Sequence, residues 1–246
     1  MRVQFPAGPS CKSVDVDAVI VDLDGTMVDT IGDFAEAITR MLADLQLPGL
    51  PASEVEHMVG KGTEHLLRSV LAHVLAQSGH PAQGLEEAVQ ALFTAALARY
   101  EHHYIAINGE HSAVYAGVKQ GLQALKAAGL RLACVTNKPM AFTRPLLAAK
   151  GLEDLFEQVF GGDSFAKKKP DPMPLLKTCE VLGVAPTRTL MVGDSSNDAQ
   201  AARAATCPVV LVTYGYNHGQ SVLAVDADGW VDSMVQLQAV AHAQEA

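Results

Sequence analysis

Val19-Ile20-Val21-Asp22-Leu23-Asp24-Gly25-Thr26-Met27-Val28-Asp29 begins as an apolar run, stops at an aspartate and continues with a second aspartate at Asp24. Short apolar runs of β-forming residues suit a strand that is buried on both faces of a parallel sheet. Such strands present their chemistry at the carboxyl end, and Gly25 permits the sharp turn that would follow. The stretch therefore predicts a buried strand that delivers two carboxylates to a loop, with an acidic turn as the purely structural alternative.

The pattern on either side of this strand divides the chain. Apolar residues at helical spacing run from 31 to about 108 without any strand signal, whereas strands alternate with helices from 109 onward. This order predicts an α/β fold, a doubly wound parallel sheet with an inserted all-helical domain. We expect a core of residues 14–30 and 109–246, a helical insertion of residues 31–108 and an N-terminal extension of residues 1–13.

Several local expectations accompany this division. The leading segment contains Pro6, Gly8 and Pro9 and predicts poor order, and residues 14–22 predict the first strand. Residues 53–59 predict a short helix inside the insertion. Trp230-Val231 predicts a last short strand, with a terminal helix after it.

Composition excludes several classes of protein. With 246 residues, 49% of them hydrophobic, the chain can bury a full core and is not disordered. The net charge of −9, with no basic cluster longer than Lys167-Lys168-Lys169, argues against nucleic-acid and anionic-membrane partners. Four scattered cysteines, no signal-peptide pattern and no run of about eighteen apolar residues predict a cytoplasmic protein without disulfides. Both a monomer and a homodimer remain open.

Polar residues follow three of the predicted strands: Asp22, Thr136 and Asp194. The carboxyl ends of parallel strands lie at one edge of the sheet, so these side chains are expected to share a site. Asp22, Asp24, Asp194 and Asp198 crowded together would shift their pKa values or bind a cation, because like charges about 4 Å apart repel by roughly 4 kcal/mol at an effective dielectric near 20. A hard, oxygen-ligated ion, with Mg²⁺ as the leading candidate, would neutralise these crowded charges, and it implies a phosphate-bearing ligand.

Two lysines are candidates for the same edge. Lys169, in Lys169-Pro170-Asp171-Pro172, precedes a predicted helix, and a rigid loop there would aim its ammonium at the carboxylates. Lys61 lies between Gly60 and Gly62 in the helical insertion, where it would pair with the carboxylate of a small acid. A solvated loop lysine is the alternative for each.

These residues resemble the four motifs of the haloacid-dehalogenase-like phosphohydrolases. The motifs occur in the family's order and cover nearly the whole chain after the extension: Asp22-Leu23-Asp24-Gly25-Thr26, Val135-Thr136-Asn137, Lys169-Pro170 and Gly193-Asp194 with Asp198. The resemblance implies that the helical insertion is a mobile cap. Four further stretches are similar to the bacterial phosphoglycolate phosphatases: Gly60-Lys61-Gly62, Tyr115-Ala116-Gly117-Val118-Lys119, Val135-Thr136-Asn137-Lys138-Pro139 and Thr213-Tyr214-Gly215-Tyr216-Asn217. Ala116 stands where those proteins usually have proline.

The resemblance also implies roles. Asp22 would be the nucleophile that forms an aspartyl-phosphate, and Asp24 the general acid and base. Mg²⁺ would be held by Asp22, the backbone carbonyl of Asp24 and Asp194, with Asp198 orienting these ligands. Thr136 and Lys169 would stabilise the phosphoryl group. Apart from the resemblance, Lys61 and Asn137 are candidates for substrate binding, and a structural role in the turn is the alternative for Asn137.

The leading hypothesis is thus a Mg²⁺-dependent phosphatase acting on a small phosphorylated metabolite, with 2-phosphoglycolate as the expected substrate. Within the same fold, a sugar-phosphate phosphatase or a mutase remains open. A phosphonate hydrolase that uses Lys61 as a Schiff base is disfavoured, because those enzymes and the dehalogenases resemble this motif but lack the second aspartate. A non-catalytic metabolite sensor is the alternative from a different class.

Overall fold

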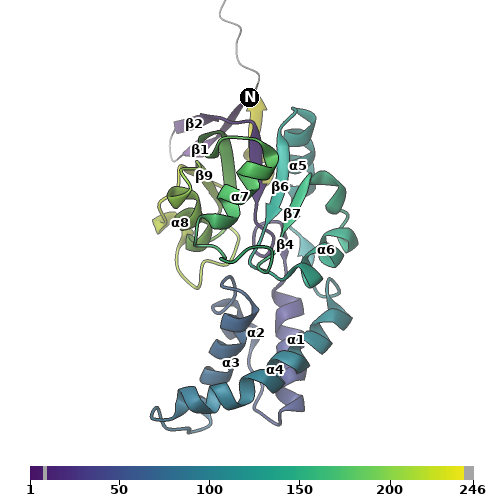
Figure 1. Ribbon diagram of the computed structural model, residues 1–246, viewed down its shortest axis with the longest axis vertical. Coiled ribbons are helices and arrows are strands. Elements are labelled where there is room, and N and C mark those ends of the chain that lie inside the picture. The colour runs from purple at the N-terminus through teal and green to yellow at the C-terminus, as the bar shows by residue number, and fades with distance from the viewer. Residues whose placement is uncertain (8–9, 241–246) are drawn as a thin grey trace, which may run out of the picture.

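The computed structural model describes residues 1–7 and 10–240 as two lobes, with a sheet-containing lobe above a helical one in Figure 1. The central sheet has six parallel strands in the order β10-β9-β8-β3-β6-β7. Their bounds are β3 Ala18–Val21, β6 Arg131–Val135, β7 Gln158–Phe160, β8 Thr189–Gly193, β9 Val209–Val212 and β10 Gly229–Val231. The predicted fold class, a doubly wound parallel sheet, is confirmed.

Alternating side chains of the strands build two cores, one on each face of the sheet. Val19 and Val21 pack on one face with helices α5 and α6, and Ala18 and Ile20 pack on the other with α7 and α8. These four helices are α5 Val118–Ala127, α6 Met140–Ala149, α7 Met173–Leu182 and α8 Ser196–Ala204. Because both faces are covered, the strands read as continuous apolar runs rather than alternating ones.

The second lobe consists of helices alone. Its members are α1 Ile31–Asp44, α2 Ala52–Glu56, α3 Thr63–Gln77 and α4 Leu85–Ile107. They bury a separate apolar core, to which Phe142 of α6 and Tyr216 also contribute. The short antiparallel pair of β4 Val28–Asp29 and β5 Ala113–Val114 lies where the chain leaves and re-enters the sheet-containing lobe.

The N-terminal segment departs from the sequence-based expectation. We predicted a poorly ordered extension, but β1 Arg2–Ala7 and β2 Ser10–Asp15 form an antiparallel pair. Strand β1 also pairs with β11 Gln238–Val240 near the other end of the chain. Val3 and Phe5 are buried in the core, so this small sheet packs on the larger one at the end opposite the helical lobe (Figure 1).

Three smaller expectations also need correction. Residues 14–22 are not one strand. Val14 and Asp15 belong to β2, which ends at Asp15, and β3 begins only at Ala18. The short helix predicted over 53–59 is α2, which ends at Glu56. In place of the terminal helix, the described chain has β11, and residues 241–246 lie outside the described residues.

Candidate functional site

The site lies at the carboxyl edge of the sheet. Strand β3 pairs in parallel with both β6 and β8, so the residues that follow these three strands meet at one edge. Asp22 follows β3, Thr136 follows β6 and Asp194 follows β8. The helical lobe lies over this edge (Figure 1).

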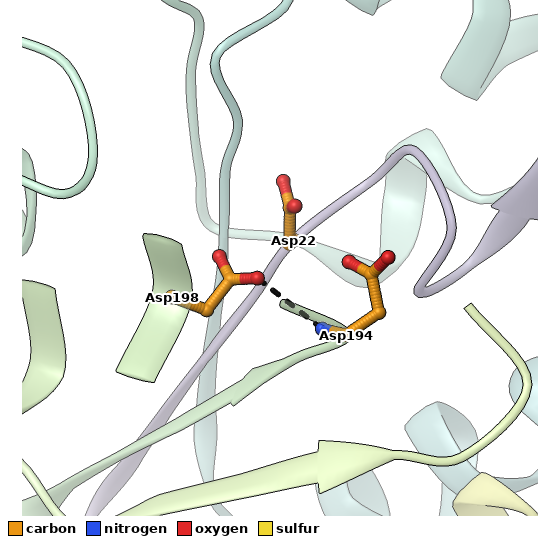
Figure 2. A group of neighbouring side chains, drawn as sticks. All are labelled: Asp22, Asp194 and Asp198. Carbon is orange, nitrogen blue, oxygen red and sulfur yellow. Dashed lines mark hydrogen bonds between the residues drawn. The ribbon is translucent and has the colours of Figure 1, made fainter. Parts of the chain in front are cut away.

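Three aspartates gather there. Asp22, Asp194 and Asp198 each offer an oxygen, and these atoms all lie within 4.8 Å of one another. Figure 2 shows the three carboxylates side by side, with Asp22 following β3 and Asp198 on helix α8. Burial raises the pKa of Asp22 to about 7, opposed by the charge of Lys169 and assisted by that of Asp198. Burial, and then the charges of Asp198 and Asp22, hold the pKa of Asp194 well above its ordinary value.

Both carboxylate oxygens of Asp198 accept hydrogen bonds from other groups of the protein. Its Oδ2 accepts hydrogen bonds from the backbone N–H groups of Asp194 (3.2 Å) and Ser195 (3.1 Å) and from the Ser195 hydroxyl (2.9 Å). This is one half of a capping box at the start of α8. Its Oδ1 accepts from Lys169 Nζ at 2.7 Å. With both oxygens engaged, Asp198 positions its neighbours.

Lys169 connects two of the aspartates. The side chain is 2% exposed, and its Nζ lies 2.8 Å from Asp22 Oδ1 as well as donating to Asp198. Val135 O accepts a further hydrogen bond at 2.8 Å. Burial alone would lower the pKa of Lys169, but the charges of Asp198 and Asp22 outweigh it and raise that pKa above its ordinary value. The lysine is therefore a permanent cation beside Asp22.

The acidic cluster suits a hard divalent cation. Asp22 Oδ1 is buried and accepts no aligned hydrogen bond within the described part of the chain, although the Lys169 charge is close. Asp194 accepts from the Thr26 hydroxyl at 3.0 Å and from the Tyr216 backbone N–H at 2.6 Å, which fixes its orientation. Carboxylate oxygens held in this way match the ligands that Mg²⁺ and similar ions prefer.

Two glycines make this packing possible. At Gly25, with φ of 81°, a Cβ atom would lie 2.3 Å from Asp194 Oδ2. At Gly193 a Cβ would lie 2.3 Å from Asp198 Cγ. Real Cβ atoms do not approach other atoms so closely, so both carboxylates depend on glycine beside them.

Asp24 belongs to the same edge but has different partners. Its Oδ1 accepts hydrogen bonds from the Thr30 hydroxyl and from Lys138 Nζ, both at 2.9 Å. The remaining oxygen, Oδ2, has no such partner in the described residues. One oxygen is thus anchored, and the other is left for a ligand.

Asn137 joins the two lobes. Its side-chain amide donates to Gly60 O of the helical lobe at 3.1 Å and to Lys169 O at 2.8 Å, and its carbonyl accepts from the Lys169 N–H at 3.0 Å. Asn197 donates to the same Gly60 carbonyl at 3.2 Å. The neighbouring Thr136 is buried, and its hydroxyl accepts from the Lys138 N–H at 3.2 Å.

Both lobes contribute to one cavity, which encloses about 550 Å³ including space open to solvent. Its lining residues are Asp22, Asp24, Phe34, Val59, Gly60, Gly62, Thr63, Leu66, Tyr100, Thr136, Asn137, Lys138, Phe142, Asp194, Ser195 and Tyr216. Gly60 and Gly62 are among them, whereas Lys61 is exposed and is not. The glycines of this loop therefore face the site, and the lysine between them does not line it.

Sequence reasoning missed two residues of the site, Lys138 and Tyr216. Tyr216 places its hydroxyl at the start of α1, where it accepts from the backbone N–H groups of Thr30 (2.8 Å) and Ile31 (3.2 Å) and bonds Asp29. Its own N–H holds Asp194, so it links the entry to the helical lobe with the acidic cluster. Both residues stand in stretches of family resemblance, which was the signal available, but nothing in the sequence showed which side chains turn inward.

Comparison with known proteins gives a consistent result. The model of the haloacid dehalogenase-like hydrolases matches residues 16–206. A phosphoglycolate phosphatase from Thiobacillus denitrificans is 45% identical over 221 residues, which cover 90% of this chain and 93% of that protein. The plasmid-encoded phosphoglycolate phosphatase of Cupriavidus necator is 46% identical over 93% of this chain and 94% of its own.

Solved structures agree. A predicted phosphoglycolate phosphatase from Haemophilus somnus superposes with a TM-score of 0.83 at 34% identity, covering 89% of this chain and 95% of that one. Within the described residues, no helix is both long enough and apolar enough to cross a membrane. The expected resemblance is confirmed: the chain belongs to the haloacid dehalogenase-like hydrolase family and is a phosphoric monoester hydrolase.

Proposed function

We propose that the protein is a Mg²⁺-dependent phosphatase that hydrolyses 2-phosphoglycolate to glycolate and phosphate through an aspartyl-phosphate. The observation that carries this proposal is the pairing of two aspartates with different environments on one cavity wall. Asp22 contacts Lys169 and the acidic cluster, whereas Asp24 has one oxygen anchored by Thr30 and Lys138. Such a division assigns nucleophilic attack to one carboxylate and proton transfer to the other.

In the first step a carboxylate oxygen of Asp22 forms a bond to phosphorus as the bond to the leaving oxygen breaks. Protonated Asp24 gives its proton to that oxygen, so the product alcohol leaves neutral. In the second step Asp24 takes a proton from water, the water oxygen bonds to phosphorus, and the Asp22–phosphorus bond breaks to release phosphate. Lys169, 2.8 Å from Asp22, offsets negative charge throughout.

The carboxylates of Asp22 and Asp194 and the backbone carbonyl of Asp24 are proposed to hold Mg²⁺. When bound, the ion would supply positive charge to the phosphoryl oxygens. Asp198, which has both oxygens engaged, keeps Lys169 and the Asp194 loop in place. Thr136 lines the cavity beside Asp22 and is proposed to bind a phosphoryl oxygen.

The helical lobe, residues 31–108, is proposed to be a cap that closes the site over its substrate. Residues of this lobe line the cavity, and two core asparagines bond Gly60 O. A closed, largely apolar roof would suit a small metabolite and exclude water. The curated relatives named phosphoglycolate phosphatase, at 45–46% identity, support the choice of substrate.

The test is phosphate release from a panel of 2-phosphoglycolate, 2-phospholactate, sugar phosphates and nucleotides, with Mg²⁺ and with a chelator. We expect preference for 2-phosphoglycolate, loss of turnover on metal removal, and no turnover in Asp22→Asn, which keeps the shape of the side chain but removes its nucleophilic charge. Substantial activity in Asp22→Asn, with a normal unfolding transition, would remove Asp22 from the nucleophile role. Broad activity would leave the mechanism standing and discard the substrate.

A further inference from the structure

Lys138 is a buried cation on the wall of the cavity. It follows Thr136 and Asn137 after strand β6, and its side chain is only 2% exposed. Burial of an ammonium is costly unless the charge is paired. Within the described residues its Nζ has one hydrogen-bond acceptor, Asp24 Oδ1 at 2.9 Å. An ammonium has three donor hydrogens, so this contact leaves donor capacity unused.

The helical lobe supplies the rest of the lysine's surroundings. Nζ lies 4.4 Å from the ring centroid of Phe34 on α1 and 4.8 Å from that of Tyr104 on α4. Both contacts are cation–π interactions. They attract the positive charge, but they do not occupy the N–H donors of the ammonium as a hydrogen-bond acceptor would. The ammonium is therefore held at the junction of the lobes, bonded to the same Asp24 oxygen that the Thr30 hydroxyl holds.

Lys138 is also the only basic side chain among the residues that line the cavity, as far as the structure describes them. Lys169 lies behind Asp22 and is engaged by two carboxylates and Val135 O. Lys61, the cation that the sequence singled out for substrate, is exposed. A negative group on the leaving part of a substrate, once inside the cavity, has Lys138 as its available counter-charge.

We propose that Lys138 recognises a carboxylate on the leaving group, so that the preferred substrates are phosphate monoesters with a carboxylate on the carbon adjacent to the leaving oxygen. The proposal rests on the phosphatase function above. Asp24 reaches the leaving oxygen in that mechanism, and Lys138 bonds Asp24 directly. A carboxylate one carbon from the leaving oxygen therefore lies within reach of the ammonium, whereas a carboxylate farther along the chain meets the apolar wall.

The test compares substrates that differ in one group. 2-Phosphoglycolate carries the carboxylate, ethyl phosphate lacks it, and p-nitrophenyl phosphate has a leaving group that needs no proton. The measured quantity is the ratio of kcat/KM for 2-phosphoglycolate to that for ethyl phosphate. In Lys138→Met we expect this ratio to fall roughly 100-fold, because a site that pairs a buried charge with a substrate group loses that discrimination with the charge.

A second variant and two comparisons complete the design. Lys138→Gln keeps a donor for Asp24 without the charge, so it is the variant to use if Lys138→Met leaves Asp24 unpaired and fails to fold; the same fall in ratio is expected. Lys168→Met removes an exposed lysine at the same edge and should leave the ratio unchanged. Lys61→Met tests the competing cation directly.

Each outcome decides something. Equal losses on 2-phosphoglycolate and ethyl phosphate, with p-nitrophenyl phosphate spared, would mean that Lys138 acts only through Asp24 and would overturn the proposal. If the kcat/KM ratio of 2-phosphoglycolate to ethyl phosphate fell in Lys61→Met and not in Lys138→Met, then Lys61 would be the residue that binds the substrate carboxylate. A wild-type enzyme that hydrolyses both small esters equally, with dependence on Asp22, would reject carboxylate recognition while leaving the phosphatase function intact. No hydrolysis of any ester would reject both.

Discussion

Single residues at this site are constrained by charge and by space together. Asp198 can hold Lys169 and the start of α8 only because Gly193 has no side chain. Likewise, Asp194 can hold its position only because Gly25 has no side chain. The carboxylates are therefore positioned by what their neighbours lack as well as by the donors around them.

Gly193→Ala tests this at one atom. Its Cβ would lie 2.3 Å from Asp198 Cγ, so the carboxylate must move away from Lys169. We expect kcat to fall about 100-fold or more and the free energy of unfolding to fall by about 1–3 kcal/mol. Steady-state kinetics and urea unfolding measure the two effects. Gly49→Ala, where a Cβ meets nothing within 4 Å, is the control, and equal behaviour of the two variants would contradict the argument.

The crowded carboxylates also predict a pH dependence. Because the pKa of Asp22 is raised from 3.8 to about 7, the folded protein binds a proton that the unfolded chain has released. The resulting stabilisation is complete below the unfolded pKa and is lost as pH rises through the folded one. The metal-free protein should therefore lose stability from about pH 4 to pH 7, and stabilisation by added Mg²⁺ should grow over that interval.

Thermal unfolding with chelator and with Mg²⁺, at several pH values across this interval, measures both trends. Asp22→Asn should reduce the pH dependence of the metal-free protein, since the amide does not titrate. A metal-free protein that gains stability as pH rises through this range would contradict the prediction.

At the level of elements, the N-terminal hairpin of β1 and β2 differs most from the sequence-based expectation. Strand β1 lies between β2 and β11, and the ring of Phe5 packs against Gly229 of β10, where a Cβ would lie 2.5 Å from it. Phe5 is 1% exposed. The hairpin therefore covers one end of the main core.

Phe5→Ala should reveal this contribution. Removal of a buried phenylalanine ring typically costs about 3–5 kcal/mol, and the rigid strands around this site leave little room for collapse. Urea unfolding should show a loss in that range, while kcat at low temperature stays near that of the wild type, because the ring lies far from the carboxyl edge. Cys11→Ser on the exposed side of β2 is the control. A loss below about 1 kcal/mol would mean that the hairpin is peripheral.

For the molecule as a whole, the two lobes meet through Gly60 O, which accepts from Asn137 and Asn197. Their other contacts differ: Asn137 also holds the backbone of Lys169, through its N–H and its carbonyl, whereas Asn197 also contacts His218 Nε2 at 3.3 Å. Contact with the helical lobe is in this way linked to the position of the lysine beside Asp22.

This difference predicts unequal effects of matched substitutions. Asn137→Ala should lower kcat about 100-fold, because it frees the Lys169 loop as well as the helical lobe. Asn197→Ala removes a contact between the lobes and one to His218 but leaves the Lys169 backbone held, so it should chiefly raise KM, by less than about tenfold. Steady-state kinetics on 2-phosphoglycolate separate the two. Equal effects on kcat would show that contact between the lobes, and not the hold on Lys169, is what matters.

The amino-acid sequence by itself determined the parallel sheet and the clustering of Asp22, Thr136 and Asp194 at one edge. Apolar runs that end at polar residues are local signals, and the geometry of parallel strands then brings their carboxyl ends together without further information. The helical region between 31 and 108 was equally visible, because its apolar stripes repeat at helical spacing.

Only the tertiary structure decided the order of the N-terminal segment and the orientation of the lysines. Residues 2–7 pair with the neighbouring β2, and residues 2–4 also pair with β11, more than 230 residues later. No local pattern encodes such a distant partner. Lys61 was predicted to bind substrate and Lys138 was not, yet Lys61 is exposed and Lys138 is buried among Asp24, Phe34 and Tyr104. Side-chain direction depends on the packing of two lobes that are separate in sequence, and that packing is settled only when the chain is folded.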